Sequence, residues 1–404
     1  MYRVYNFFRN MKKYLIPTAV AILTVSSLSL QAKPATVKPL DVVSSKSAST
    51  FFTGNIQLSG RQLLVDGVPF VMKGVCYSPI KKGMMFPDGL ITLNPTPDDL
   101  VTVEKDFQLM QQAGINTIRT YLPITNAAVL ALLTKYNLRT IVPICPGYDF
   151  YQNLDAIAQN VDLLKNEPST LIWEIGNEWN LNHFYTYNPR ASGEDQGTSD
   201  LSAQQCLDLI QTVANLVRGH DGAHPVSCDI SCPSSPSLIL SSEQPNNSSQ
   251  GESCVYQVIP DCVDMIGVNV YHGLDFGSGF KMWNQLTDKP FYIGETGAVA
   301  WNANINAEDD DSQALGDRCA AMNIMNNLSA NSSNILVGGC LFEWCDEWWK
   351  SGFPLDHDTT GLTLPTGPYP GNCYINEWFG ILDIDHNPRA AYDAIKSVFN
   401  PTPQ

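Results

Sequence analysis

Residues 115–177 read INTIRTYLPITNAAVLALLTKYNLRTIVPICPGYDFYQNLDAIAQNVDLLKNEPSTLIWEIGN. Three short apolar runs rich in β-branched residues stand in this stretch, namely INTIRTY, LRTIVPIC and LIWEIGN. The two segments between the runs are helix-like in composition and spacing. Strands that alternate with helices in this way are typical of βαβ units, so the stretch predicts three parallel strands of an α/β fold.

The same alternation continues on both sides of this stretch. Before it, residues 61–70 predict a hairpin centred on Asp66 and Gly67, then a strand in VMKGVCY (71–77) and a helix between Thr96 and Gly114. After it, further strands are expected in VSCDIS (226–231), MIGVNVY (265–271), FYIGETG (291–297) and LVGGCLFEW (336–344), with helices near 201–219, 281–286 and 311–329 and from Pro388 onward. VSCDIS has the weakest strand pattern. Eight strand–helix units predict a (β/α)8 TIM barrel with a short N-terminal β-hairpin.

The N-terminal residues predict export. Arg3, Arg9, Lys12 and Lys13 precede an apolar run at 15–30, and Ala32 offers a small residue for cleavage. We therefore expect a signal peptide at 1–32, a flexible leader at 33–52 and one catalytic barrel domain at 53–400, in a secreted or periplasmic protein. A permanent membrane anchor is the alternative, although the apolar run is short for a membrane span. No membrane partner is expected after the signal is removed.

Composition narrows the possible ligands. A formal net charge of -16 argues against nucleic acid and anionic membranes as partners, and it is compatible with a neutral substrate. The six histidines form neither HxH nor HExxH, and no CxxC pair is present, so no metal and no cofactor is expected. Of the eleven cysteines, Cys76, Cys145 and Cys340 are expected to be buried thiols, whereas bridge candidates are Cys228, Cys232, Cys254, Cys262 and Cys373.

Two glutamates close predicted strands. Glu178 follows the strand LIWEIGN, and Glu295 stands at the end of the strand in FYIGETG. Active groups of a TIM barrel gather at the C-terminal ends of its strands, so the two carboxylates are expected to face each other across the barrel mouth. A retaining glycosidase needs such a pair about 5–5.5 Å apart. Glu174 lies deeper on the same strand as Glu178 and is expected to be structural.

These residues resemble glycoside hydrolase clan A over roughly residues 60–400, particularly the family 2 catalytic barrels and the family 72 fungal β-1,3-glucanosyltransferases. The pair Asn177-Glu178 is similar to the clan's Asn-Glu at the end of the fourth strand. Glu295 is similar to the nucleophile of the seventh strand, and residues 377–396 look like the closing segment of family 2 barrels. The resemblance therefore implies that Glu178 is the acid/base and Glu295 the nucleophile.

The resemblance implies four substrate-binding residues. Arg119 in NTIRTY matches the arginine that hydrogen bonds the nucleophile and is expected to keep Glu295 ionised. Asn177 would hold the sugar 2-hydroxyl, Tyr271 would lie near the nucleophile, and Trp344 would form an aromatic platform against the sugar. A buried ion pair with Glu174 or Asp106 is the alternative reading of Arg119.

The predicted function is a retaining β-glycoside hydrolase that acts on a β-linked oligo- or polysaccharide by double displacement. β-Glucan is the favoured substrate, with β-mannan and β-galactoside behind it. A transglycosylase would use the same site with a sugar acceptor in place of water. A catalytically silent glycan-binding barrel is the alternative from another class, although binding alone does not require two opposed carboxylates. A metal-dependent hydrolase is disfavoured by the histidine pattern.

Overall fold

The computed structural model describes residues 54–144, 153–179, 203–231, 261–271, 273–276, 280, 283–284, 287–330, 334–363 and 373–401. The predicted signal peptide and leader, residue 53 and most of the helix expected at 281–286 lie outside these ranges.

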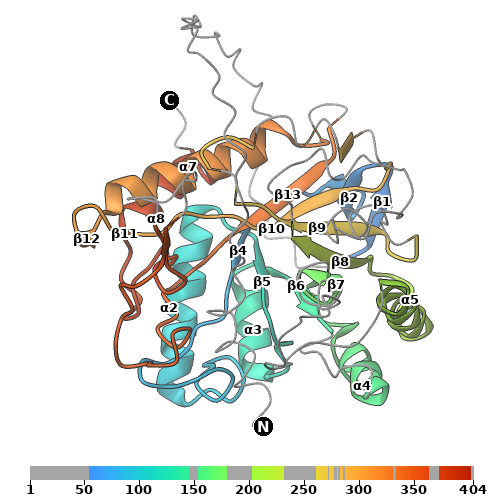
Figure 1. The fold of residues 1–404 in the computed structure, drawn as a ribbon. Coiled ribbons are helices and arrows are strands. Elements are labelled where there is room, and N and C mark those ends of the chain that lie inside the picture. The colour runs from blue at the N-terminus through green and yellow to red at the C-terminus, as the bar shows by residue number, and fades with distance from the viewer. Residues whose placement is uncertain are drawn as a thin grey trace, which may run out of the picture.

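Eight parallel strands form a closed barrel (Figure 1). Around the barrel the strands are β4 (Met72–Cys76), β5 (Thr117–Arg119), β6 (Arg139–Pro143), β7 (Thr170–Ile175), β8 (Val226–Ser231), β9 (Met265–Asn269), β10 (Phe291–Glu295) and β13 (Leu336–Leu341). Every barrel strand expected from the sequence is present, including the weakly patterned fifth strand, β8. The prediction of a TIM barrel is confirmed.

Helices follow the strands and cover the outside of the barrel (Figure 1). They are α2 (Pro97–Ala113), α3 (Ala127–Lys135), α4 (Leu154–Leu164), α5 (Ala203–His220), α7 (Asp310–Asn326) and α8 (Ala390–Phe399). The last helix packs against both α7 and α2, so it joins the end of the barrel to its beginning. Asp309 accepts a hydrogen bond from the backbone N–H of Ser312, which makes it the N-cap of α7, as expected of a helix start.

An antiparallel hairpin precedes the first barrel strand. β2 (Gln62–Val65) pairs with β3 (Val68–Pro69) across Asp66 and Gly67, and β1 (Ile56–Ser59) adds a third strand. Asp66 and Gly67 have φ angles of 53° and 78°, which a two-residue type I′ turn requires. The predicted N-terminal hairpin is therefore confirmed. Small two-stranded pairs also lie in the segments after β10 and β13, namely β11 (Trp301–Asn302) with β12 (Ala307–Glu308) and β14 (Leu362–Thr363) with β15 (Cys373–Tyr374).

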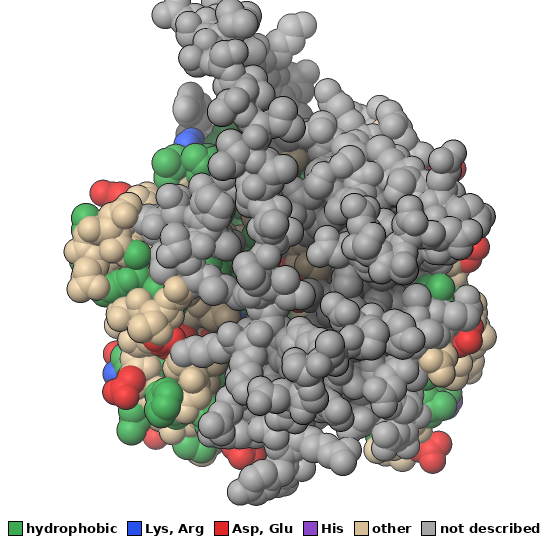
Figure 2. All heavy atoms as spheres, in the orientation of Figure 1, with side chains coloured by type: hydrophobic (Ala, Val, Ile, Leu, Met, Phe, Trp, Pro, Cys, Tyr) green, Lys and Arg blue, Asp and Glu red, His purple; other side chains and the backbone are tan. Residues whose placement is uncertain are grey.

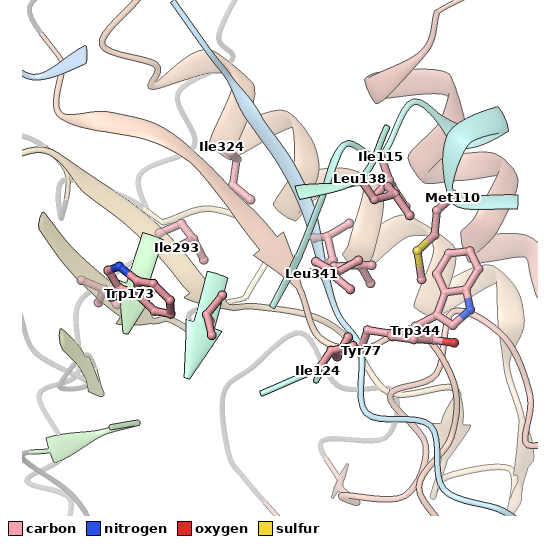
Figure 3. Packing of buried hydrophobic residues seen from close by; sticks show 14 of the residues in the cluster. Tyr77, Met110, Ile115, Ile124, Leu138, Trp173, Ile293, Ile324, Leu341 and Trp344 are labelled. Atoms are coloured by element: carbon pink, nitrogen blue, oxygen red, sulfur yellow. The ribbon is translucent and has the colours of Figure 1, made fainter. Parts of the chain in front are cut away.

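Two apolar clusters hold the barrel together. The larger one fills the space between the strands and the helices, and Figure 3 shows part of it, with Met110 of α2 beside Tyr77 and Trp344. The second cluster includes Met72, Cys76 and Cys340, and it also contains Ile56 and Leu63 of the hairpin. Arg61 of the hairpin donates to the backbone carbonyls of Asn284 and Thr287, just before β10 begins, so the hairpin covers the N-terminal end of the barrel and leaves the C-terminal end for a site.

Acidic side chains are spread over the described surface in the view of Figure 2, as the net charge of -16 leads one to expect. None of the described helices has the length and apolar character needed to cross a bilayer.

The described cysteines correct part of the expectation for disulfides. Cys76 and Cys340 are buried thiols, as predicted. Cys228 and Cys262 were bridge candidates, but both are free, and Cys228 is buried on the outward face of β8 in the larger cluster. Cys145, Cys232 and Cys254 lie outside the described residues, as does the side chain of Cys373.

Candidate active site

Glu295 is surrounded by hydrogen-bond donors at the C-terminal end of β10. Its Oε1 accepts hydrogen bonds from Arg119 Nη1 at 2.8 Å and from the Tyr121 hydroxyl at 2.5 Å. Its Oε2 accepts one from the Tyr271 hydroxyl at 3.1 Å. Both carboxylate oxygens therefore have donors, one of them cationic, and these hydrogen bonds hold the Glu295 side chain in place.

Arg119 connects three strands at the centre of the site. The side chain is fully buried, and its Nε lies 3.0 Å from both carboxylate oxygens of Glu174. Its Nη1 donates to Glu295 and its Nη2 donates to Asn177 Oδ1 at 2.8 Å. Arg119 therefore forms ion pairs with both Glu174 and Glu295. Asp106 instead accepts from Tyr77 and contacts His386.

Glu178 lies just beyond β7, in a turn with left-handed backbone. Gly176 and Glu178 have φ angles of 69° and 50°, and a Cβ on Gly176 would collide with the Trp179 indole. The backbone N–H of Glu178 donates to Asp229 Oδ1 at 3.2 Å and so ties the turn to β8. This turn brings the Glu178 side chain to the network around Glu295, because only a tight bend reverses the chain so soon after a strand.

The charge environment of Glu178 is the opposite of that of Glu295. The side chain is half-buried and accepts hydrogen bonds from Asn269 and Ser231. Burial, followed by repulsion from the Glu295 carboxylate, raises the pKa of Glu178 to about 7. A carboxyl group with this pKa carries its proton in neutral solution for part of the time and is suited to donate it.

Asn177 and Asn269 bridge the two glutamates. Asn177 Oδ1 accepts from Arg119 Nη2 and from Asn269 Nδ2, the latter at 3.1 Å. Because Asn269 also hydrogen bonds Glu178, a continuous chain of contacts runs from Glu178 through both amides and Arg119 to Glu295. The structure therefore brings Glu178, Glu295, Arg119, Asn177 and Tyr271 to one end of the barrel, as the sequence predicted.

The structure does not place Trp344 against this site, which corrects its expected role as a platform. Trp344 is 0% exposed, its ring lies 6.4 Å from that of Tyr392 on α8, and Figure 3 shows it beside Met110 and Tyr77. The backbone N–H of Trp344 donates to Cys76 O, which holds the residue over the end of β4. The physical reason is that β13 ends at Leu341, so the chain has already turned outward by position 344.

Phe342 is the aromatic residue after β13 that packs near Glu295. Its ring lies 6.3 Å from the ring of Tyr271, which hydrogen bonds Glu295, and 5.3 Å from that of Phe379. Tyr374 packs against Phe379 in turn. Burial is the main cause that raises the pKa of Tyr374, and the negative charges of Glu178 and Glu295 raise it further. The aromatic wall of the site is therefore built from Phe342, Tyr271 and Tyr374, and all three rings pack against the buried Phe379.

A lysine near the wall is already paired. Lys350 Nζ lies 2.5 Å from Glu347 Oε2, 3.6 Å from Glu343 Oε1 and 4.3 Å from the centre of the Phe342 ring. Burial and the neighbouring Glu347 raise the pKa of Glu343 well above its ordinary value, and Glu347 forms the shorter of the two ion pairs with Lys350. The cluster adds no net positive charge to the site.

Sequence reasoning missed several groups that complete the site, namely Tyr121, Asp229, Ser231, Asn269, Phe342, Lys350 and Tyr374. Two of them could have been predicted from the sequence. Tyr121 is two residues beyond Arg119 and Asn269 is two residues before Tyr271, so each lies on the same strand face as a predicted site residue. Asn180, His183 and His272, which follow Glu178 and Tyr271 closely in the sequence, lie outside the described residues. The described residues contain no group of three or more His, Cys, Asp and Glu side chains that could hold a metal ion.

Comparison with known proteins gives a match at the level of structure. No protein-family model matches the sequence, and no curated protein matches it. A GH2 β-galacturonidase from Eisenbergiella tayi bound to glycerol matches with a TM-score of 0.54 and 15% identity, over 87% of this chain and 54% of that chain. A β-D-glucuronidase from Dictyoglomus thermophilum matches with a TM-score of 0.54 and 17% identity, over 87% and 54%.

A third structure is a Bifidobacterium dentium β-glucuronidase complexed with coumarin-3-O-glucuronide, with a TM-score of 0.55 and 17% identity over 87% of this chain and 49% of that chain. This chain therefore spans about half the length of the structures that it matches. At these identities the likeness shows a shared fold, a barrel of the kind found in GH2 enzymes.

Proposed function

We propose that this protein is a retaining β-glycoside hydrolase that acts on a neutral β-linked glycan, with β-glucan as the favoured substrate. Glu295 is the nucleophile and Glu178 is the acid/base. The single observation that carries the proposal is the contrast between the two carboxyl groups. Glu295 is bound by Arg119 and two tyrosine hydroxyls, whereas burial and repulsion raise the pKa of Glu178 to about 7. Two carboxyl groups in such different environments are what an acid and a nucleophile require.

The first half of the reaction forms a glycosyl-enzyme. A Glu295 oxygen attacks the anomeric carbon while the bond from that carbon to the leaving oxygen breaks. Glu178 transfers its proton to the leaving oxygen, so that the departing group leaves as an alcohol. Tyr271 and Tyr121 hold the two oxygens of Glu295 in place, and Asn177 lies between Arg119 and Asn269 where it can bind the sugar 2-hydroxyl.

The second half releases the sugar. Glu178, now ionised, takes a proton from water as the water oxygen attacks the anomeric carbon and the bond to Glu295 breaks. Both carboxyl groups return to their starting states, and two inversions at the anomeric carbon retain the β configuration. A sugar hydroxyl in place of water would give transglycosylation at the same site.

The charges around the nucleophile favour a neutral sugar. Among the described residues, Arg119 and Lys350 are the positively charged side chains whose pKa the Glu295 charge raises. Each already forms an ion pair, Arg119 with Glu174 and Lys350 with Glu347. The matched structures are named as a β-galacturonidase and a β-glucuronidase, and the sugars in those names carry a carboxylate. A cationic side chain that is free to pair with this carboxylate would bind such a sugar. Because neither cation near Glu295 is unpaired, we propose a glucan, mannan or galactoside in preference to a uronide.

The predicted signal peptide supports export of the enzyme. The basic start, the apolar run at 15–30 and Ala32 are features of a secreted or periplasmic protein. A polymeric glycan outside the cytoplasm is a substrate that suits such a location.

The test is a substrate panel with two active-site variants. Residues 33–404 would be assayed on β-glucans, β-mannans, aryl β-galactosides and aryl β-glucuronides, beside Glu178→Gln and Glu295→Gln. We expect turnover of a neutral glycan, a loss of several orders of magnitude in both variants, and a decline in wild-type activity as pH rises through about 7, where Glu178 loses its proton. The control Asp155→Asn alters an exposed acid on α4 and should leave the rate unchanged.

Chemical rescue separates the two roles. Glu178→Ala should retain glycosylation of an activated aryl glycoside, which needs no proton, and azide should restore turnover to a β-glycosyl azide. Glu295→Ala should give an α-glycosyl azide, since azide then attacks the substrate directly. The proposal is wrong if the wild type binds a β-glycan without turning any substrate over, because the barrel is then a binding module. Product sizes distinguish hydrolysis from transfer.

A further inference from the structure

The interior of the barrel holds more buried acid than one cation can balance. Arg119 is in contact with three carboxyl groups that are at most 7% exposed, Glu174, Asp229 and Glu295. Burying an uncompensated charge costs several kcal/mol, and in practice an acid then keeps its proton. Arg119 offsets one negative charge, so at least one of the three carboxyl groups is under strong pressure to be neutral.

Contacts identify Asp229 as the neutral group. Glu174 has Arg119 Nε at 3.0 Å and the Tyr292 hydroxyl at 2.6 Å, and Glu295 has donors on both oxygens. Asp229 has its ion pair with Arg119 at the longer distance of 3.6 Å. Its Oδ1 accepts the Glu178 backbone N–H, whereas Oδ2, the oxygen that forms the 3.6 Å ion pair with Arg119, has no hydrogen-bond partner among the described residues although the side chain is 0% exposed.

A second buried oxygen without a donor lies beside Asp229. Asn269 Oδ1 has no hydrogen-bond partner, and Asn269 is 2% exposed. A Cβ added to Gly294 would overlap both Asp229 Oδ2 and Asn269 Oδ1, so the two oxygens converge on the same point. Two acceptors that face each other in a dry interior repel, whereas one proton between them forms a hydrogen bond.

We propose that Asp229 is a positioning residue that works as a neutral carboxylic acid, with Oδ2–H donating to Asn269 Oδ1. This hydrogen bond fixes which way the Asn269 amide points. With Oδ1 held by Asp229, Asn269 Nδ2 is directed at Asn177 Oδ1 and at the carboxyl group of Glu178. Asp229 therefore holds the acid/base from two sides, through Asn269 and through the Glu178 backbone N–H. The inference rests on the proposed role of Glu178.

Electrostatics supports the same state. Burial raises the pKa of Asp229 well above its ordinary value, and the attraction of Arg119 opposes this. The carboxyl groups that face it from β7, the turn after β7 and β10 raise it further, namely Glu174, Glu178 and Glu295. A neutral Asp229 also limits the negative charge around Glu295 and leaves Arg119 to the two glutamates.

Infrared difference spectroscopy tests the protonation directly and needs no activity. The spectrum of the wild type minus that of Asp229→Asn at pH 7 should contain the carbonyl stretching band of a protonated carboxylic acid. Loss of an ionised carboxylate band instead would overturn the proposal. Because this measurement uses the folded protein alone, it decides the state of Asp229 even if no glycan is turned over and the proposed function fails.

Kinetics tests the positioning role. Asp229→Ala should lower kcat about 100-fold by releasing Asn269 and the Glu178 turn. Asp229→Asn should recover most of that loss, because its amide can donate to Asn269 Oδ1 and still accept from Glu178, and it should keep the alkaline limb of the pH profile near 7. A downward shift of that limb in Asp229→Asn would mean that a negative charge was removed beside Glu178, and it would contradict the proposal.

The pair Asp229→Ala and Asn269→Ala completes the test. If Asp229 acts through Asn269, the double variant should be little worse than the more damaged single variant. Losses that multiply would show that the two side chains act independently, and the positioning role would then be wrong. Circular dichroism spectra of all variants would confirm that each one is folded.

Discussion

At the scale of single residues, the site was predictable where a side chain closes a strand and not where it enters from a neighbouring one. Glu178, Glu295 and Arg119 could be identified because each stands at the end of an apolar strand, where an acid or a base is conspicuous. Asp229 has no such signal, and Tyr121 has only its position two residues beyond Arg119. A tyrosine and an aspartate beside a strand are common in loops and cores, and only the closed barrel brings them to Glu295 and Asn269.

The Trp344 error has a specific cause at this scale. The sequence LFEW has two aromatic residues of the same parity, Phe342 and Trp344, and the resemblance to clan A led us to expect that Trp344 faces the sugar. Where the strand ends decides between them, and β13 ends at Leu341. Strand ends depend on tertiary pairing with β4 and β10, so local pattern alone does not locate them.

Replacing Tyr121 tests whether it contributes to the chemistry. Tyr121→Phe removes the hydroxyl that donates to Glu295 Oε1 at 2.5 Å and leaves the ring in place. A hydrogen bond to a charged group contributes about 1.5–3 kcal/mol, so kcat/KM should fall about 10- to 100-fold. Steady-state kinetics on the substrate found by the panel would measure the change.

Tyr136→Phe is the matched control. It removes a hydroxyl that donates to Glu104, at the C-cap of α3 just before β6 begins, at the end of the barrel opposite to Glu295. The rate should remain as in the wild type. Equal kinetic losses in the two variants would show that Tyr121 has a structural role alone.

At the scale of elements, helix boundaries were the most reliable prediction. Thr96 and Gly114 were expected to bound a helix, and α2 runs from Pro97 to Ala113 with Thr96 as N-cap and Gly114 in the left-handed conformation, at φ 80°. The reason is that a cap is local chemistry: Thr96 Oγ1 accepts from the Asp99 N–H, and Asp99 Oδ2 accepts from the Thr96 N–H. No distant contact is needed to define it.

Thr96→Ala should therefore affect stability without affecting activity. Loss of the capping side chain costs about 1 kcal/mol, which lowers Tm by about 2 °C in a domain of this size. Differential scanning calorimetry would measure Tm. Thr96→Ser keeps the hydroxyl and should stay close to the wild type, so an equal drop in Tm for Ser and Ala would argue that the methyl group, and not the hydrogen bonds, stabilises the helix.

At the scale of the whole molecule, the number and order of the barrel strands could be predicted from the sequence. The pairing that closes the barrel could not be predicted from any local stretch of sequence. Alternating strands and helices are repeated along the chain, so counting them gave eight units. Closure depends on pairing between residues far apart, such as Met72 with Gly338 and Lys73 with Gly339. The register shift between β10 and β13 is likewise a property of the assembled barrel, with no counterpart in the strand pattern.

Gly338 is the residue on which this closure depends most directly. Its φ is 132°, and a Cβ there would overlap the backbone N and O of Met72 across the β13–β4 pair. Backbone cannot move aside as a flexible side chain does, so Gly338→Ala should cost at least about 3 kcal/mol and reduce both soluble yield and Tm. Gly219→Ala is the control, since nothing lies within 4 Å of a Cβ at that position of α5 and alanine favours the helix. If Gly338→Ala unfolded at the temperature of Gly219→Ala, pairing between β13 and β4 would not be what holds the barrel closed.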